Sequence, residues 1–170
     1  MSINTEPEIH KNIICANVYI KKDGRYLLLR RSPQKKWLPN ILHPIGGKVD
    51  LNENPYIAAQ REVFEEAGIK VKNMKLEAVI LEITPIKYDR TNWLIFHFSA
   101  DYDSGEIGQT EEGTLEWHTV DGIKNEKLFL SVDAVIDHIL DPNDGTLFAT
   151  IEYNEDKTAI IDKKIDLCVK

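Results

Sequence analysis

The amino-acid sequence predicts an α/β fold, and two observations lead to this prediction. The chain has 170 residues, 42% of them hydrophobic, which is enough for one substantial core and too few for two. Strand-like and helix-like segments also mix along the chain without a regular βαβ repeat. We therefore expect residues 1–170 to form a single domain with one active region.

The first predicted element is a β-hairpin. Residues 13–20 (IICANVYI) and 25–31 (RYLLLRR) are apolar and rich in residues that favour strands. Asp23 and Gly24 lie between them, and an Asp-Gly pair is a strong signal for a tight hairpin turn. The domain is therefore expected to open with two antiparallel strands.

A loop is predicted after this hairpin. Residues 32–44 contain three prolines, a composition that favours irregular structure leading into Ile45, Gly46 and Gly47. The two glycines allow the backbone to turn sharply and to approach a ligand closely. Because loops in such positions often carry ligand contacts, this segment is a candidate part of the site.

The helix with the clearest signals covers residues 54–66. Asn54 suits the N-cap, Pro55 suits the first turn, and Gly68 lies where a left-handed C-terminal residue is expected. The later elements follow from the same kinds of pattern. They are strands at residues 69–83, 92–102 and 114–120, a helix at 131–140 capped by Ser131, and a C-terminal hairpin extension at 145–165.

Three glutamates crowd the end of the helix at 54–66. At helical spacing Glu62, Glu65 and Glu66 share one face. The apolar residues are expected to pack on the other face, namely Tyr56, Ile57, Ala59, Val63 and Phe64. Like charges at i,i+4 destabilise a helix by roughly 0.2–0.5 kcal/mol, and carboxylates near its C-terminus add a similar penalty. A solvated acidic stripe is the ordinary explanation, but a bound divalent cation would reverse both penalties.

The available ligand types indicate which cation is expected. Cys15 and Cys168 are the only cysteines, they form no Cys-x-x-Cys pair, and no two histidines have helical spacing. Hard carboxylate oxygens favour Mg²⁺, or Mn²⁺, over Zn²⁺. Because Mg²⁺ often shares the phosphate oxygens of its substrate, this pattern indicates phosphate chemistry.

The same segment resembles the Nudix box, at residues 47–69. Gly47, five residues, Glu53, seven residues and then REVFEEAGI fill all seven specified identities and both apolar positions of that motif. Such a match has a chance probability on the order of one in 10⁸ per start site. The resemblance implies a Nudix fold, in which a mixed curved β-sheet is sandwiched between α-helices. It also implies hydrolysis of a diphosphate linked to another moiety, usually a nucleoside.

The resemblance further implies roles for individual residues. The three glutamates Glu62, Glu65 and Glu66 match metal-binding positions, and so does the carbonyl of Gly46. In the same motif, Glu53 and Arg61 match positions that support the loop and the helix, and Arg61 is spaced to pair with Glu65. The base that takes a proton from the attacking water is then a box glutamate or one from a later loop, and we favour Glu65.

Segments outside the box resemble MutT-type members of the family. Glu112, in EEGTLEW at residues 111–117, is a further candidate metal ligand, with an ordinary acidic loop as the alternative. Arg31 lies where MutT-like enzymes often have an arginine that reaches the substrate phosphates, with a surface arginine as the alternative. His43 and Lys48 are candidate substrate-binding residues, although a structural role is the alternative for the histidine. The likeness implies an oxidised purine nucleoside triphosphate such as 8-oxo-dGTP as substrate, with the monophosphate and pyrophosphate as products.

The composition argues against several other kinds of partner. A net charge of -7 and a pI near 5.3 do not suit a protein that binds polymeric nucleic acid. No apolar run approaches the ~18 residues that a membrane span requires, and the scarcity of cysteine fits a cytoplasmic location. The sequence makes no prediction of the oligomeric state.

Other enzyme classes fit the motifs less well. The GGK at residues 46–48 suggests a P-loop, but Leu42 and Val49 stand where that motif requires Gly and Ser or Thr. Neither a Gly-x-Ser-x-Gly elbow nor a His-Glu-x-x-His helix occurs. Dinucleotide and nucleotide-sugar diphosphatases stay as alternatives because the same box serves them. A regulator that binds nucleotide without hydrolysis is the alternative from another class, although such proteins usually have a damaged box.

Overall fold

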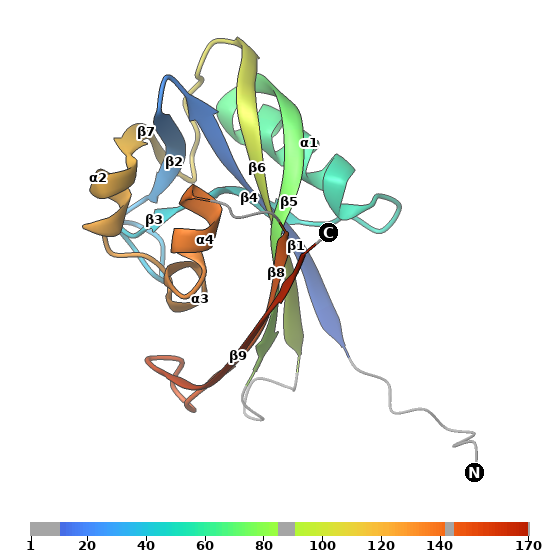
Figure 1. Cartoon of the computed structure of the whole chain (residues 1–170). Coiled ribbons are helices and arrows are strands. Elements are labelled where there is room, and N and C mark those ends of the chain that lie inside the picture. Colours follow the sequence, from blue (N-terminus) through green and yellow to red (C-terminus); the bar gives the residue numbers. More distant parts are fainter. Residues whose placement is uncertain (1–10, 85–90, 142–144, 170) are drawn as a thin grey trace.

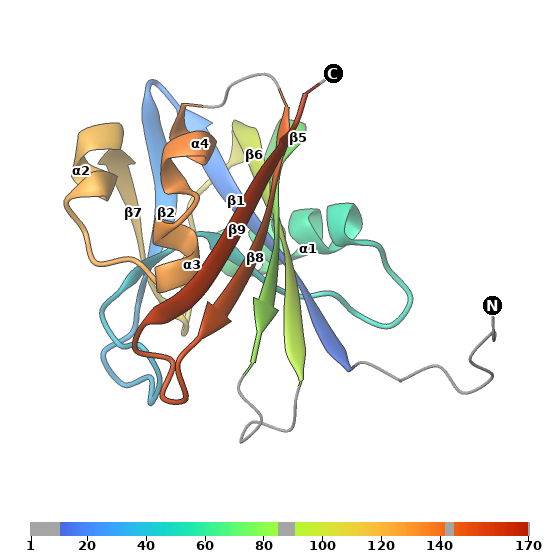
Figure 2. The same cartoon turned by 60° about the horizontal axis from the view of Figure 1, so that its bottom comes forward.

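A single nine-stranded, mixed β-sheet organises the computed structural model, which describes residues 11–84, 91–141 and 145–169. The strands are β1 (Asn12–Lys22), β2 (Arg25–Arg31), β3 (Leu42–His43), β4 (Ile45–Lys48), β5 (Ile69–Ile83), β6 (Asn92–Gly105), β7 (Gly113–Thr119), β8 (Thr146–Tyr153) and β9 (Ile160–Cys168). The helices are α1 (Pro55–Ala67), α2 (Val120–Lys124), α3 (Leu130–Asp133) and α4 (Ile136–Leu140). Helix α1 lies on one side of the curved sheet and α2, α3 and α4 lie on the other (Figures 1 and 2). The predicted α/β class and the curved sheet between helices are therefore confirmed.

The predicted N-terminal hairpin is present. Lys22 on β1 pairs with Arg25 on β2, and the two turn residues Asp23 and Gly24 have positive φ values of 50° and 73°. Two successive left-handed residues define the turn that matches the twist of a hairpin. Strand β1 then continues as the centre of the sheet, because it pairs in parallel with β6 and antiparallel with β4.

Strand β1 separates two hydrophobic cores. Ala16 and Val18 face the core that α1 covers, and Cys15 and Tyr19 face the core that α3 and α4 cover. Successive side chains of a strand point to opposite faces, so this alternation is what a sheet covered on both sides requires.

The predicted loop at residues 32–44 is wrong at its C-terminal end. Leu42 and His43 form the short strand β3 beside β2, and Gly46 and Gly47 lie inside strand β4 rather than in a loop. Leu42 and Ile45 are fully buried. Burial of these two side chains holds the segment against the sheet despite its prolines, which local composition could not indicate.

The predicted helix at 54–66 is confirmed as α1. Asn54 caps it, because its Oδ1 accepts hydrogen bonds from the backbone N–H of Tyr56 at 3.0 Å and of Ile57 at 3.1 Å. Gly68 ends it in the left-handed region, with φ of 72°.

The packing face predicted for α1 is confirmed at Ala59 and Val63 and wrong at the three larger residues. Tyr56, Ile57 and Phe64 are 44%, 48% and 59% exposed, whereas the small residues Ala58, Ala59, Val63 and Ala67 are fully buried. Small side chains let the helix approach the sheet closely, and this brings the adjacent glutamates toward β4. The carboxylates of Glu62 and Glu66 therefore lie at the helix–sheet junction instead of on a separate solvent face.

The predicted helix at 131–140 is divided into α3 and α4, so that prediction is wrong. Ser131 lies inside α3 and is buried, while Phe129 occupies the N-cap position without a side-chain hydrogen bond. The backbone leaves the helical region at Val135, with φ of -125° and ψ of -2°. The short helix α2 directly after β7 was not predicted.

The predicted C-terminal hairpin is present as β8 and β9. It is not an appendage, because β8 pairs in parallel with β5 from Ala78 opposite Leu147 to Ile83 opposite Glu152. The buried side chains of β8 complete the core under α3 and α4. Within the described residues, no helix has the length and apolar character needed to cross a membrane.

Candidate active site

The site is built where the C-terminal half of α1 meets strand β4. The Glu62 carboxylate lies directly over Gly47, since a Cβ added to this glycine would be 2.5–2.7 Å from the Glu62 carboxyl atoms. The backbone N–H of Gly46 donates to Glu66 Oε2 at 3.3 Å. Two carboxylates are thus held against two consecutive glycines, and any side chain at Gly47 would displace Glu62.

The backbone of Gly46 faces the helix. Val49 N donates to Ile14 O at 2.9 Å, so the alternating ladder between β1 and β4 directs the N–H and C=O of Gly46 away from β1. Gly46 has φ of 154°, and a Cβ there would collide with the Ala16 carbonyl oxygen. Glycine is therefore required at this position, and its carbonyl is directed to the side where the glutamates lie.

Arg61 joins the acidic residues of the box into one network. Its Nη1 donates to Glu62 Oε1 at 2.8 Å and to Glu65 Oε2 at 3.0 Å, which includes the predicted i,i+4 pair. Its Nη2 donates to Glu53 Oε1 at 2.6 Å and to the Lys48 carbonyl at 3.0 Å. Strand β4, the connecting segment and α1 are therefore fixed to one another through a single guanidinium.

The electrostatics of the two inner carboxylates differ from those of ordinary surface glutamates. Burial raises the pKa of Glu66 from 4.5 to about 7, with repulsion from Glu62 and Glu112 acting in the same direction. Burial also raises the pKa of Glu62, although the hydrogen bond from Arg61 opposes this shift. Both carboxylates are therefore harder to ionise than an exposed glutamate, chiefly because they are partly withdrawn from water.

Residues of β2 and β7 form the opposite rim of the site. Arg31 pairs with Gly113 in the ladder between these strands, and Glu112 directly precedes that glycine. The charges of Arg31 and Glu112 both act on the pKa of Glu66, so they face the same region. Lys35 Nζ lies 2.6 Å from Glu112 Oε2, a contact between two loop residues that the sequence did not indicate.

The neighbouring arginines Arg30 and Arg31 have different surroundings. Arg30 is held by Glu116 at 2.9 Å and by Glu126 at 2.8 Å, which fits a structural role. Arg31 donates only a long hydrogen bond of 3.4 Å to the Trp37 carbonyl, and its Nε is buried without a partner among the described residues. Arg31 is thus the arginine of the pair with unused donors.

The other two candidate substrate residues are placed differently. The ring Nδ1 of His43 contacts its neighbouring carbonyl, Pro44 O, at 2.7 Å, and burial lowers the pKa of His43 to about 4. This imidazole is therefore neutral at pH 7. Lys48 has an exposed side chain whose Nζ lies 5.9 Å from the centre of the Trp93 ring, away from the network of Arg61.

The donor set fits a hard divalent cation. Glu62 and Glu66 supply two half-buried carboxylates with raised pKa values, and a cation between them would offset their mutual repulsion. In the described part of the chain, no three carboxylate, imidazole or thiol groups converge into a ready-made metal cage. Glu65 is 55% exposed and directed to Arg61, so it would have to turn to join the other two. Mg²⁺ usually retains waters and substrate phosphates as ligands, and it does not require a complete protein cage.

Comparisons with known proteins agree with this geometry. The family model of the NUDIX domain matches residues 10–139, and the chain therefore belongs to the Nudix family and is a Nudix hydrolase. It is 30% identical over 141 residues to the Nudix hydrolase YvcI of Bacillus subtilis, with 81% of this chain and 84% of that protein covered. It is also 30% identical over 120 residues to the NAD-capped RNA hydrolase NudC of Chromobacterium violaceum, with 69% of this chain and 42% of NudC covered. Among solved structures, a mutator MutT protein from Bacillus halodurans matches with a TM-score of 0.79 at 25% identity, over 91% of this chain and 97% of that one.

Proposed function

We propose that this Nudix hydrolase cleaves nucleoside triphosphates in the presence of Mg²⁺. The preferred substrate is an oxidised purine deoxynucleotide such as 8-oxo-dGTP, and the products are the monophosphate and pyrophosphate. The observation that carries the proposal is the pair of half-buried carboxylates, Glu62 and Glu66, held against Gly46 and Gly47. Similarity over nearly its whole length to a mutator MutT protein supports the MutT-like resemblance from which the triphosphate substrate is inferred.

Each residue has a defined part in this proposal. Glu62, Glu65, Glu66 and the Gly46 carbonyl would hold the metal, with Glu112 as a further ligand from the opposite rim. The bound metal would offset the charge of the diphosphate and lower the pKa of a water ligand. Arg31 supplies unused donors to the phosphates, and Glu65 takes the proton of the attacking water. Mn²⁺ has the same preference for hard oxygen ligands and should replace Mg²⁺.

The remaining residues position these groups. Arg61 and Glu53 hold α1 against β4, so that Glu62 stays over Gly47. His43 is proposed as a contact to the base, because its neutral imidazole suits an uncharged base better than a phosphate. Lys48 is proposed as a further substrate contact, which requires its exposed side chain to turn from its position beside Trp93. A small nucleotide is the substrate class that these residues fit.

A dinucleotide substrate is the second candidate, and one observation favours it. NudC of Chromobacterium violaceum is named for NAD-capped RNA, whose cap contains a dinucleotide diphosphate, and it is as similar in identity as YvcI. A regulator that binds nucleotide without hydrolysis has no such support, because all seven box identities are present.

The test is a substrate panel with Mg²⁺ in which the phosphorus products are identified. It should contain 8-oxo-dGTP, the normal nucleoside triphosphates, NAD, a NAD-capped RNA and a nucleotide sugar. We expect pyrophosphate from 8-oxo-dGTP at the highest kcat/KM, loss of product with EDTA, and recovery with Mg²⁺ or Mn²⁺. If nucleoside monophosphates were released from NAD and no triphosphate in the panel were cleaved, the dinucleotide proposal would replace the triphosphate one.

A further inference from the structure

Strand β9 is an open edge of the sheet. It is the last strand in the sheet order and pairs with β8 alone among the described strands. All of its residues after Ile160 are exposed, whereas alternate residues of β8 are buried. Alternate backbone N–H and C=O groups of β9 therefore point to solvent, which is the arrangement that a further strand can use.

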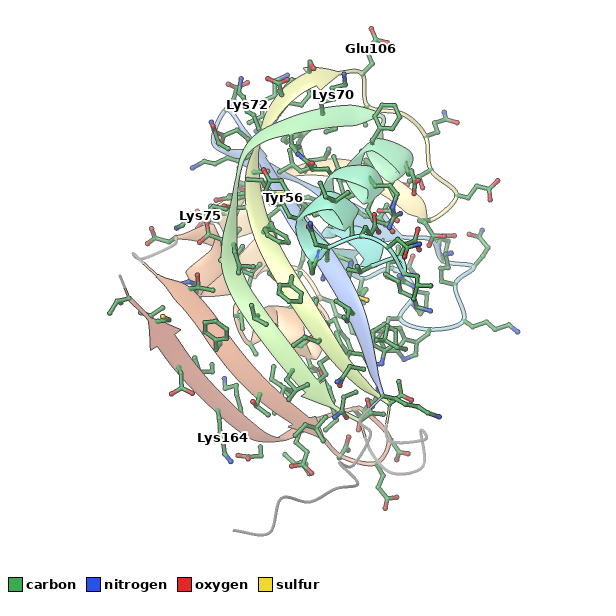
Figure 3. The ribbon with its side chains drawn as sticks, turned by 90° about the vertical axis from the view of Figure 1, so that its right-hand side faces the viewer. Tyr56, Lys70, Lys72, Lys75, Glu106 and Lys164 are labelled. Atoms are coloured by element: carbon green, nitrogen blue, oxygen red, sulfur yellow. The ribbon has the colours of Figure 1, made fainter. Side chains whose placement is uncertain are left out.

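The two faces of β9 have different side chains. Ile165 and Leu167 lie on the face covered by α3 and α4, opposite the buried Ala149 and Leu147, yet they remain 42% and 45% exposed. On the other face, Lys164 and Asp166 alternate along the edge; Figure 3 shows Lys164 on β9, far from α1. The apolar residues continue the core beyond the area that the helices cover.

We propose that β9 pairs antiparallel with β9 of a second copy of this chain, centred on Ile165. A two-fold interface must be complementary to itself. With Ile165 opposite Ile165 of the second copy, Lys164 of each chain lies opposite Asp166 of the other. The joined sheet then has two cross-strand pairs of opposite charge on one face. On the other face Ile165 lies opposite its own copy, between two pairs of Lys163 and Leu167.

The charges also select this register from its neighbours. Centring the pair on Lys164 places this lysine opposite itself and Asp162 opposite Asp166. Centring the pair on Lys163 forms two Asp162–Lys164 pairs, but it places Lys163 opposite itself at the centre and extends the pairing toward the irregular end of β9 near Ile160. Among the residues that the structure describes, the ion pair of Lys164 is a long contact of 3.9 Å with Asp162, and both side chains are more than half exposed. Lysines on an edge strand oppose unselective pairing, so the same residues limit the assembly to the matched register.

The experiment uses charge reversal and mixing. Sedimentation velocity over a range of concentrations should show a monomer–dimer equilibrium for the wild-type chain. Lys164→Asp alone and Asp166→Lys alone should each weaken the dimer on the order of tenfold or more, because two attractive pairs become repulsive. An equimolar mixture of the two variants should recover a one-to-one heterodimer, since each pair is again of opposite charge. Lys70→Asp, an exposed charge change on β5, should leave the equilibrium unchanged.

Several results would overturn the proposal. One is a wild-type chain that stays monomeric at every concentration; another is a dimer that neither charge variant weakens. A groove of about 160 Å³ beside the edge, lined by Val79, Leu94 and Phe148 among others, is a competing contact surface. A dimer that Phe148→Asp disrupts, but that Lys164→Asp does not, would place the interface there. Circular dichroism and hydrolysis measured on the same samples separate loss of assembly from loss of folding.

Discussion

Replacing Glu66 with glutamine should stabilise the metal-free protein while it removes activity. Burial and neighbouring carboxylates raise the pKa of Glu66 from 4.5 to about 7, so ionisation of this group opposes folding at neutral and higher pH. One pKa unit corresponds to about 1.4 kcal/mol, and the full effect is therefore about 3 kcal/mol. The amide retains an oxygen that can accept the Gly46 N–H and carries no charge.

The sign of the pH dependence follows from linkage. The folded state holds the Glu66 proton more tightly than the unfolded state does, so the penalty is absent below pH 4.5 and develops as the pH rises to about 7. In EDTA, Glu66→Gln should therefore match the wild type at pH 4 and exceed it by about 3 kcal/mol at pH 8. For a domain of this size, the gain corresponds to a melting temperature higher by roughly 5–10 °C.

Thermal and urea unfolding at the two pH values measure this effect. Glu106→Gln, at an exposed position outside the site, should show no such gain and serves as the matched control. Mg²⁺ should raise the melting temperature of the wild type more than that of Glu66→Gln, and turnover of the variant should fall by orders of magnitude. Equal stability of variant and wild type at pH 8, or full activity of the variant in saturating Mg²⁺, would refute the reasoning.

Three further predictions concern neighbouring residues. Gly47→Ala places a methyl group within 2.7 Å of the Glu62 carboxylate and should lower kcat/KM roughly a hundredfold. Gly108→Ala should retain activity in the same assay, because the nearest atom to its added methyl group is Ala67 O at 3.8 Å. Arg31→Ala should raise KM and leave the free energy of unfolding nearly unchanged. Arg30→Ala should lower the free energy of unfolding by about 1–2 kcal/mol, because Glu116 and Glu126 lose their partner. If Arg30→Ala raised KM and Arg31→Ala lowered stability, the roles assigned to the two arginines would be exchanged. Phe64→Ser should change the free energy of unfolding by less than about 0.5 kcal/mol, but Val63→Ala should cost about 1–3 kcal/mol in urea denaturation. A large loss for Phe64→Ser would restore the packing face that the helical pattern suggested.

Local sequence signals were sufficient for the elements whose ends are set by local chemistry. The Asp23-Gly24 turn and the Asn54 and Gly68 caps were predicted because each depends on the backbone preferences of a few adjacent residues. The division of the helix at 131–140 was not predicted. Its break at Val135 accompanies burial of residues on both sides of it, a tertiary effect that overrides helical periodicity.

The sequence by itself determined the chemistry of this protein, since the box glutamates, the two glycines and Arg61 have fixed identities and spacing that define a Nudix hydrolase. Only the tertiary structure decided how these residues are used. Glu62 and Glu66 lie against β4, with Glu62 also bonded to Arg61, whereas Glu65 is exposed beside Arg61. Arg30 is paired with two carboxylates, and Arg31 has a buried Nε without a partner among the described residues. The physical reason is that burial and ion pairing depend on strands β2, β4 and β7, which are distant along the chain and meet only in the folded sheet.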